Sequence, residues 1–173
     1  ETAELVFEDC RVPAANMLGK KNKGFKIAMK TLDASRVEVG AAAVGIAQSA
    51  IDYSVDYAKG RICFGAPIAK LQAIQFMLAD MQIQTQAARS LVYGAAEMVD
   101  NNIRPYTEIC AAAKCFAGDV AMKVTTDAVQ IHSGYGYMRD YPVEKLMRDA
   151  KLFQIFEGTN QIQRVVVAGS MLK

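Results

Sequence analysis

The segment 154–161 sets one carboxylate among apolar side chains. Glu157 follows Ile155 and Phe156 and precedes Gly158, where a helix is expected to begin. A carboxylate flanked by apolar groups can act as a general base once a ligand expels water, because desolvation favours its protonated form. An acidic residue at this position also complements the positive end of the helix dipole, which is the more common role. The residues alone leave both interpretations open.

Two further segments could contact a phosphate-bearing ligand. Arg61 and Phe64 lie together in one break between helices, and a guanidinium with an aromatic ring can hold phosphate and cover a flat heterocycle. The turn 133–137 could bring its backbone close to a phosphate, but it follows a helix and does not carry the dinucleotide-binding glycine pattern. An ordinary solvated loop and an interhelical turn are the alternatives. His132 is expected to be a packed or exposed histidine, with a proton-shuttle role as the lesser alternative.

Composition excludes several classes of function. Twenty basic residues against eighteen acidic ones leave a net charge of +2, without a basic run, so a nucleic-acid partner is not expected. Four cysteines form no CxxC pair and only one histidine is present, which disfavours a metal site and suggests reduced thiols of a cytosol-like compartment. No apolar stretch reaches the roughly eighteen residues of a membrane span, so a soluble protein without a membrane association is expected. The start at Glu1, without a methionine, suggests a fragment.

The elements that must position these residues are mostly helices. Residues 4–10 predict a strand that needs partners from elsewhere. Residues 25–59 contain no proline and predict one long helix, whose middle (40–45) is rich in glycine and alanine and therefore suited to burial between helices.

Apolar periodicity predicts the remaining helices. After the break at 60–67, a second helix carries an apolar stripe at three- and four-residue spacing, and a third helix ends near His132. Residues 142–149 and 159–172 predict two shorter helices. The fold class is therefore all-α, an antiparallel four-helix-type bundle. The two stripes expected to face its interior are Leu71, Ile74, Leu78 and Met81, and Ile109, Ala113, Phe116, Val120 and Val124.

The stretches YPVEKLMRDAK (141–151) and IFEGTNQIQR (155–164), in this order, resemble the C-terminal signature of the acyl-CoA dehydrogenase family. The resemblance extends over the whole chain. It implies that residues 24–173 form the family's C-terminal helical domain and that residues 1–23 are the tail of the middle β-domain, with one strand remnant, and a linker.

The resemblance assigns a role to Glu157. In short- and medium-chain members the glutamate of the glutamate-glycine-threonine motif is the catalytic base, and Glu157 occupies its place. Some relatives carry the base just before an arginine that corresponds to Arg36, where this chain has Ser35, which cannot serve. FAD would accept the β-hydride while Glu157 takes the α-proton, leaving a trans-2-enoyl-CoA, with the thioester carbonyl held by the base's own N–H and by the flavin.

The same resemblance implies the binding residues. Ser133 stands where many relatives have glycine, and Phe156 replaces a frequent tyrosine. The acyl-CoA contacts would be Asp33, Ala34, Ser35, Arg36 and Gly158. The FAD contacts would be Arg61, Cys63, Phe64, Gln72, Gln130, Ile131, His132, Ser133, Gly134, Thr159 and Gln161, many of them reaching the cofactor of a neighbouring subunit.

The resemblance further implies a homotetramer built as a dimer of dimers, with electron-transferring flavoprotein as redox partner. It is strongest to butyryl-CoA dehydrogenases, which suggests a short-chain acyl-CoA substrate and a bacterial cytoplasm or a mitochondrial matrix. The fragment alone is expected to fold but to lack activity and bind FAD weakly. The alternatives are a same-fold flavin oxidase, which would use oxygen, and a purely structural helical oligomerisation domain.

Overall fold

A computed structural model describes residues 3–173, which divide into two compact units at Thr31 and Leu32. In the first unit, residues 3–13 form no strand, and a short 3-10 helix, η1 (Ala14–Asn16), precedes the start of the long helix α1 (Gly24–Gly60). The predicted strand at 4–10 is therefore not formed here, because a lone alternating segment has no neighbour to pair with.

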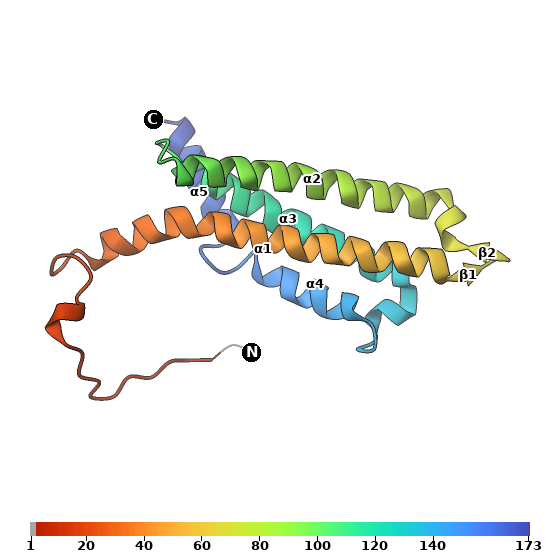
Figure 1. The fold of residues 1–173 in the computed structure, drawn as a ribbon, viewed down its shortest axis with the longest axis horizontal. Helices are drawn as coiled ribbons and strands as arrows, with labels where there is room; N and C mark the ends of the chain where they lie inside the picture. Colours follow the sequence, from red (N-terminus) through yellow and green to blue (C-terminus); the bar gives the residue numbers. More distant parts are fainter. Residues whose placement is uncertain (1–2) are drawn as a thin grey trace. The chain divides into compact units, whose positions relative to one another are not determined.

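The second unit is a helical bundle (Figure 1). The predicted helices are confirmed within a few residues, and within residues 3–173 the only strands form a small hairpin between α1 and α2, with Ile62 opposite Pro67. The elements after α1 are β1 (Ile62–Cys63), β2 (Ala66–Pro67), η2 (Ile68–Lys70), α2 (Gln72–Asp100), α3 (Thr107–His132), η3 (Ser133–Tyr137), α4 (Pro142–Leu152) and α5 (Asn160–Met171). The predicted all-α bundle is confirmed.

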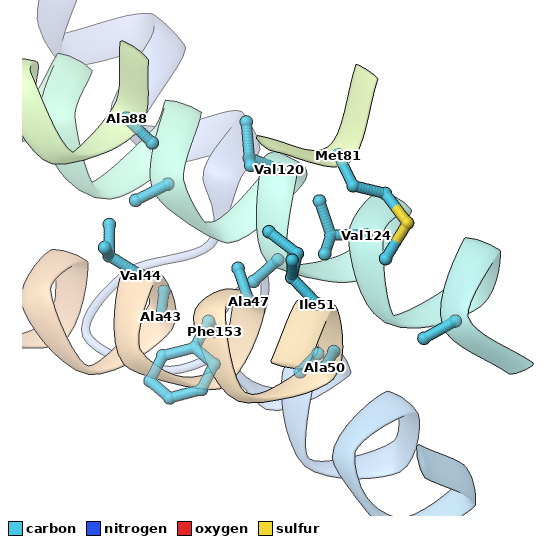
Figure 2. Packing of buried hydrophobic residues seen from close by; sticks show 14 of the residues in the cluster. Ala43, Val44, Ala47, Ala50, Ile51, Met81, Ala88, Val120, Val124 and Phe153 are labelled. Carbon is cyan, nitrogen blue, oxygen red and sulfur yellow. The ribbon is translucent and has the colours of Figure 1, made fainter. Parts of the chain in front are cut away.

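Helix α3 is central in the second unit and packs against α2, α4 and α5. The core between α1, α2 and α3 is rich in alanine, which lets helix axes approach closely. In the small-residue stretch of α1, Gly40, Ala43 and Val44 are buried, and a Cβ on Gly40 would lie 3.0 Å from Val92. Figure 2 shows Val44, Ala47 and Ile51 of α1 directed toward α3, with Ile51 beside Val124.

The predicted stripes are mostly internal. Met81, Val120 and Val124 are buried, whereas Leu71 is 40% exposed and Phe116 is 39% exposed. Leu71 precedes the first residue of α2, so it does not share the helix face of its stripe. Phe116 lies on the side of α3 that borders α5, next to an open apolar cavity of about 270 Å³.

No helix in the described part of the chain is both long and apolar enough to cross a membrane. Among residues 3–173, no group of three or more histidine, cysteine, aspartate or glutamate side chains is arranged to hold a metal ion.

Candidate active site

Glu157 lies on a tight turn between α4 and α5. Its φ is +56° and that of Gly158 is +85°, so two consecutive residues are left-handed. Glycine adopts this conformation freely, but for other residues it costs about 1–2 kcal/mol and persists only where the surroundings enforce it. The backbone at Glu157 is therefore held in place by its neighbours.

Two buried side chains bond the carbonyl groups of this turn. Lys114 Nζ donates to the Gly158 carbonyl at 2.7 Å. Gln163 Nε2 donates to the carbonyls of Glu157 and Gly158 at 3.1 and 2.9 Å. Both side chains are fully buried, whereas Glu157 and Gly158 are half-buried, so it is the donor groups that are shielded from competing water.

The side chain of Glu157 points toward α1. Ser35 Oγ donates to Glu157 Oε2 at 2.7 Å, which links the turn to the segment 33–36, far away in sequence. Helix α5 begins only at Asn160, and Thr159 caps it by accepting from the Ile162 N–H. The cap is thus supplied by Thr159, and the Glu157 carboxylate is bound to a different helix.

Two other predicted acyl-CoA contacts, Asp33 and Arg36, lie beside Ser35 on α1 and pair with each other. Asp33 accepts from Arg36 at 2.9 Å through one oxygen and from Thr107 at 3.1 Å through the other. Arg36 is only 6% exposed, and its Nε has no hydrogen-bond partner in the structure. The structure therefore brings Glu157 and the segment 33–36 together.

A polar network anchors the start of α5 beneath the turn. Asn160 accepts from Lys114 and donates to the Cys115 carbonyl and to Asp119. Arg164 also donates to Asp119, at 2.6 Å. Burial pushes the pKa of Asp119 upward, but hydrogen bonds from Arg164, Asn160 and Gln154 outweigh it and leave the pKa below its ordinary value.

Sequence reasoning did not single out Lys114, Asn160 or Gln163. Lys114 had a visible signal, because it is a lone cation on an otherwise apolar face of α3. Asn160 and Gln163 stand in the signature stretch 155–164, but nothing in the sequence marks them as buried, since an amide at the start of a helix usually faces solvent.

A second cavity, of about 410 Å³, opens near the end of α1, the hairpin and η3. Arg61 and Tyr135 both line this cavity, and the Arg61 guanidinium lies over the Tyr135 ring, 5.2 Å from its centre. Six of the predicted FAD contacts line this cavity: Arg61, Cys63, Gln130, Ile131, Ser133 and Gly134.

The remaining predicted FAD contacts lie elsewhere. Phe64 is 97% exposed at the tip of the hairpin, and Gln72 is exposed at the start of α2. Thr159 and Gln161 border a different cavity, of about 390 Å³, near Asp119. The predicted FAD residues thus form separate groups on this chain.

His132 is packed inside the bundle. It is 2% exposed, its Nδ1 donates to the Ala128 carbonyl at 2.8 Å, and its ring stacks on Tyr57 at 4.2 Å. Burial lowers the pKa of His132, which keeps the imidazole neutral near pH 7. The packed histidine is the interpretation that this geometry favours over a proton shuttle.

Substituting Gly158 tests how tightly the turn is held. A Cβ at this position would lie 2.8 Å from Gln163 Nε2, on backbone at φ +85°. We expect Gly158→Ala to lower the free energy of unfolding of the 173-residue chain by about 1–2 kcal/mol in urea denaturation. The matched control is Gly45→Ala on α1, where a Cβ meets nothing within 4 Å; it should be neutral or slightly stabilising, by about 0.5–1 kcal/mol. Equal effects of both substitutions would contradict this account of the turn.

The sequence comparisons agree with this architecture. Residues 22–172 match the family described as acyl-CoA dehydrogenase, C-terminal domain. The chain belongs to the acyl-CoA dehydrogenase family. The predicted family and fold are therefore confirmed.

Several family members are similar over nearly the whole chain. An acryloyl-CoA reductase (NADH) of Anaerotignum propionicum is 57% identical over 173 residues, which is 100% of this chain and 44% of that protein. The structure of butyryl-CoA dehydrogenase from Megasphaera elsdenii is 54% identical with a TM-score of 0.93, over 97% of this chain and 44% of that one. An acyl-CoA dehydrogenase from Bacillus anthracis, solved with FAD, is 35% identical with a TM-score of 0.91, over 96% of this chain and 32% of that one. The chain thus spans less than half the length of these relatives.

Proposed function

We propose that the protein containing this domain is an FAD-dependent acyl-CoA dehydrogenase acting on short, straight acyl-CoA thioesters, with Glu157 as the base. The observation that carries the proposal is the contact between the Glu157 carboxylate and Ser35, at 2.7 Å, in a member of this family. It joins the only acidic side chain of segment 154–161 to the segment expected to bind the acyl-CoA.

The chain's own residues would prepare the substrate for loss of its α-proton. The Glu157 N–H would donate to the thioester carbonyl, which stabilises the negative charge that develops as the proton leaves. The carboxylate would accept that proton, and a bound thioester would exclude water and raise its affinity for protons. Ser35 would hold the carboxylate in the absence of substrate. Gly158 would contact the acyl chain through its backbone, because the direction of its missing Cβ is occupied by Gln163 Nε2.

The cavity beside the hairpin fits a cofactor such as FAD. Arg61 supplies a cation for phosphate, and Ile68 and Leu71 supply apolar surface for a flat ring. A Cβ at Gly134 would meet nothing within 4 Å, so a ligand can approach the backbone there. When bound, FAD would supply the acceptor for the β-hydride.

The separation of the predicted FAD contacts supports an oligomer. Phe64 projects from a two-residue turn in which both it and Gly65 have positive φ, so the ring is presented outward, 97% exposed. A ring in this position is suited to contact a cofactor held by a neighbouring subunit. We therefore propose the homotetramer, a dimer of dimers, in which each FAD touches Thr159 and Gln161 of one subunit and the hairpin of another. Electron-transferring flavoprotein is the proposed redox partner.

A substrate panel on the full-length enzyme tests the proposal. With a dye as electron acceptor, kcat/KM should be highest for butyryl-CoA and fall for longer and branched acyl chains. One missing or extra methylene is worth about 1–3 kcal/mol, or roughly 10–200-fold, in such a pocket. A preference for long or branched chains would refute the short-chain assignment, and rapid reduction of oxygen without dye would favour an oxidase.

The reverse reaction is a second candidate, because the acryloyl-CoA reductase of Anaerotignum propionicum is 57% identical. The same groups would then catalyse reduction of the enoyl-CoA, with Glu157 donating a proton to the α-carbon. Reduction of acryloyl-CoA that depends on NADH, faster than dye-coupled oxidation of propionyl-CoA, would support this direction.

A further inference from the structure

Lys114 occupies a position on α3 that a helical bundle ordinarily fills with an apolar side chain. Cys110 and Gly118, one turn before and after it, are buried, and Lys114 itself is fully buried. Burial lowers the pKa of Lys114, because a dry interior disfavours the charged ammonium. An apolar side chain of similar length would fill the same space without that penalty.

The ammonium of Lys114 is directed at the turn that carries Glu157. It donates to the Gly158 carbonyl at 2.7 Å and to Asn160 Oδ1 at 3.0 Å. Asn160 is the first residue of α5, so one cation holds both the turn and the helix that follows it. The carbonyl it binds belongs to Gly158, the residue directly after the base.

Gln163 completes this support from α5. Its Nε2 lies within hydrogen-bond distance of the Glu157 and Gly158 carbonyls, so three bonds converge on two neighbouring carbonyl groups. Those carbonyls are oriented together by the positive φ of Glu157 and Gly158. A return of Glu157 to an ordinary negative φ would turn its carbonyl away from these donors and redirect its side chain.

We propose that Lys114 is a positioning residue, whose ammonium fixes the Glu157–Gly158 turn in the left-handed conformation that aims the Glu157 carboxylate toward Ser35. The inference rests on the proposed function of Glu157 as base. Lys114 acts on the reaction through the backbone of the turn, with Gln163 as the weaker, neutral support.

Lys114→Met in the full-length, FAD-loaded enzyme tests the inference, since methionine nearly keeps the length and removes the ammonium. We expect kcat for butyryl-CoA to fall about 10- to 100-fold, because displacing a reacting group by about 1 Å costs up to roughly 10²-fold. FAD content and KM should stay within about twofold of the parent values. The isotope effect on kcat with butyryl-CoA deuterated at the α-carbon should rise, because proton removal becomes more rate-limiting.

A merely structural role would not change the isotope effect. Such a role would reduce the fraction of active, flavin-loaded enzyme and leave the isotope effect of the remaining sites unaltered, and that result would overturn the inference. The matched control is Lys123→Met on the exposed side of α3, where the lysine pairs with Asp127; its kcat and isotope effect should equal those of the parent.

A second variant decides the question if Lys114→Met does not fold. Gln163→Met removes the neutral donor to the same two carbonyls, and we expect a smaller fall in kcat, about tenfold, with the same rise in isotope effect. An unchanged isotope effect in Gln163→Met would overturn the inference. Full turnover by Glu157→Gln would refute the base itself, whereas an inactive Glu157→Gln beside a fully active Lys114→Met would refute only the role of Lys114.

Discussion

Replacing Glu157 by glutamine in the full-length enzyme is expected to lower kcat for butyryl-CoA by about 10²- to 10⁴-fold, the usual contribution of a general base. Glutamine keeps the size of the side chain and an oxygen that can accept from Ser35, so the turn should survive. FAD content, assembly and the melting temperature should therefore match those of the parent. The loss should appear in kcat and kcat/KM alike, because the base acts only in the transition state.

The control for this substitution is Glu97→Gln, at an exposed position on α2. This substitution also removes one negative charge, but at a position outside the turn. It should leave kcat within about twofold of the parent value. If Glu157→Gln behaved like Glu97→Gln, Glu157 would be a structural residue, and the helical oligomerisation domain would become the better account of this chain.

Met81→Ala is expected to have the largest effect on stability. Met81 is 0% exposed, and Figure 2 shows it next to Val124 in the interior of the bundle. Loss of a buried methionine side chain leaves a cavity that close-packed helices cannot fill, so the free energy of unfolding should fall by about 2–5 kcal/mol. Urea denaturation of the 173-residue chain, with an unchanged m-value, is the measurement.

Met171→Ala is the matched control, because Met171 at the end of α5 is 74% exposed. It should change the free energy of unfolding by no more than about 0.5 kcal/mol. A small effect of Met81→Ala would mean that the interior repacks around the missing side chain, which would contradict the close packing of α1, α2 and α3.

The helices could be predicted from sequence because their signals are local. Long alanine-rich stretches without proline define α1 and α3, and the breaks at 60–67 and 101–105 contain glycine, asparagine or proline. The prediction of a strand at 4–10 was wrong for the described structure, because alternating apolar residues indicate a strand but not the partner it needs. Phe116 was predicted to be buried but is exposed. Periodicity shows that it lies on the apolar face of its helix, but not whether a neighbouring helix covers it.

The site could be predicted in part. Glu157 could be predicted as the base from its apolar neighbours and from the resemblance of its motif to the family signature. Ser35 was identified only through that resemblance. The hydrogen bond between them joins residues 122 positions apart, which no local pattern encodes. Lys114 was missed because a single lysine in a helix is normally solvated, although it is the lone cation on an apolar face of α3, and the fold shows that it is buried.

The most direct test of the central claim is a crystal structure of the full-length enzyme with FAD and an unreactive butyryl-CoA analogue. We predict that a Glu157 carboxylate oxygen lies about 3–3.5 Å from the α-carbon, on a turn that keeps its bond to Lys114. A Glu157 carboxylate directed away from the α-carbon, with another side chain in its place, would contradict the account.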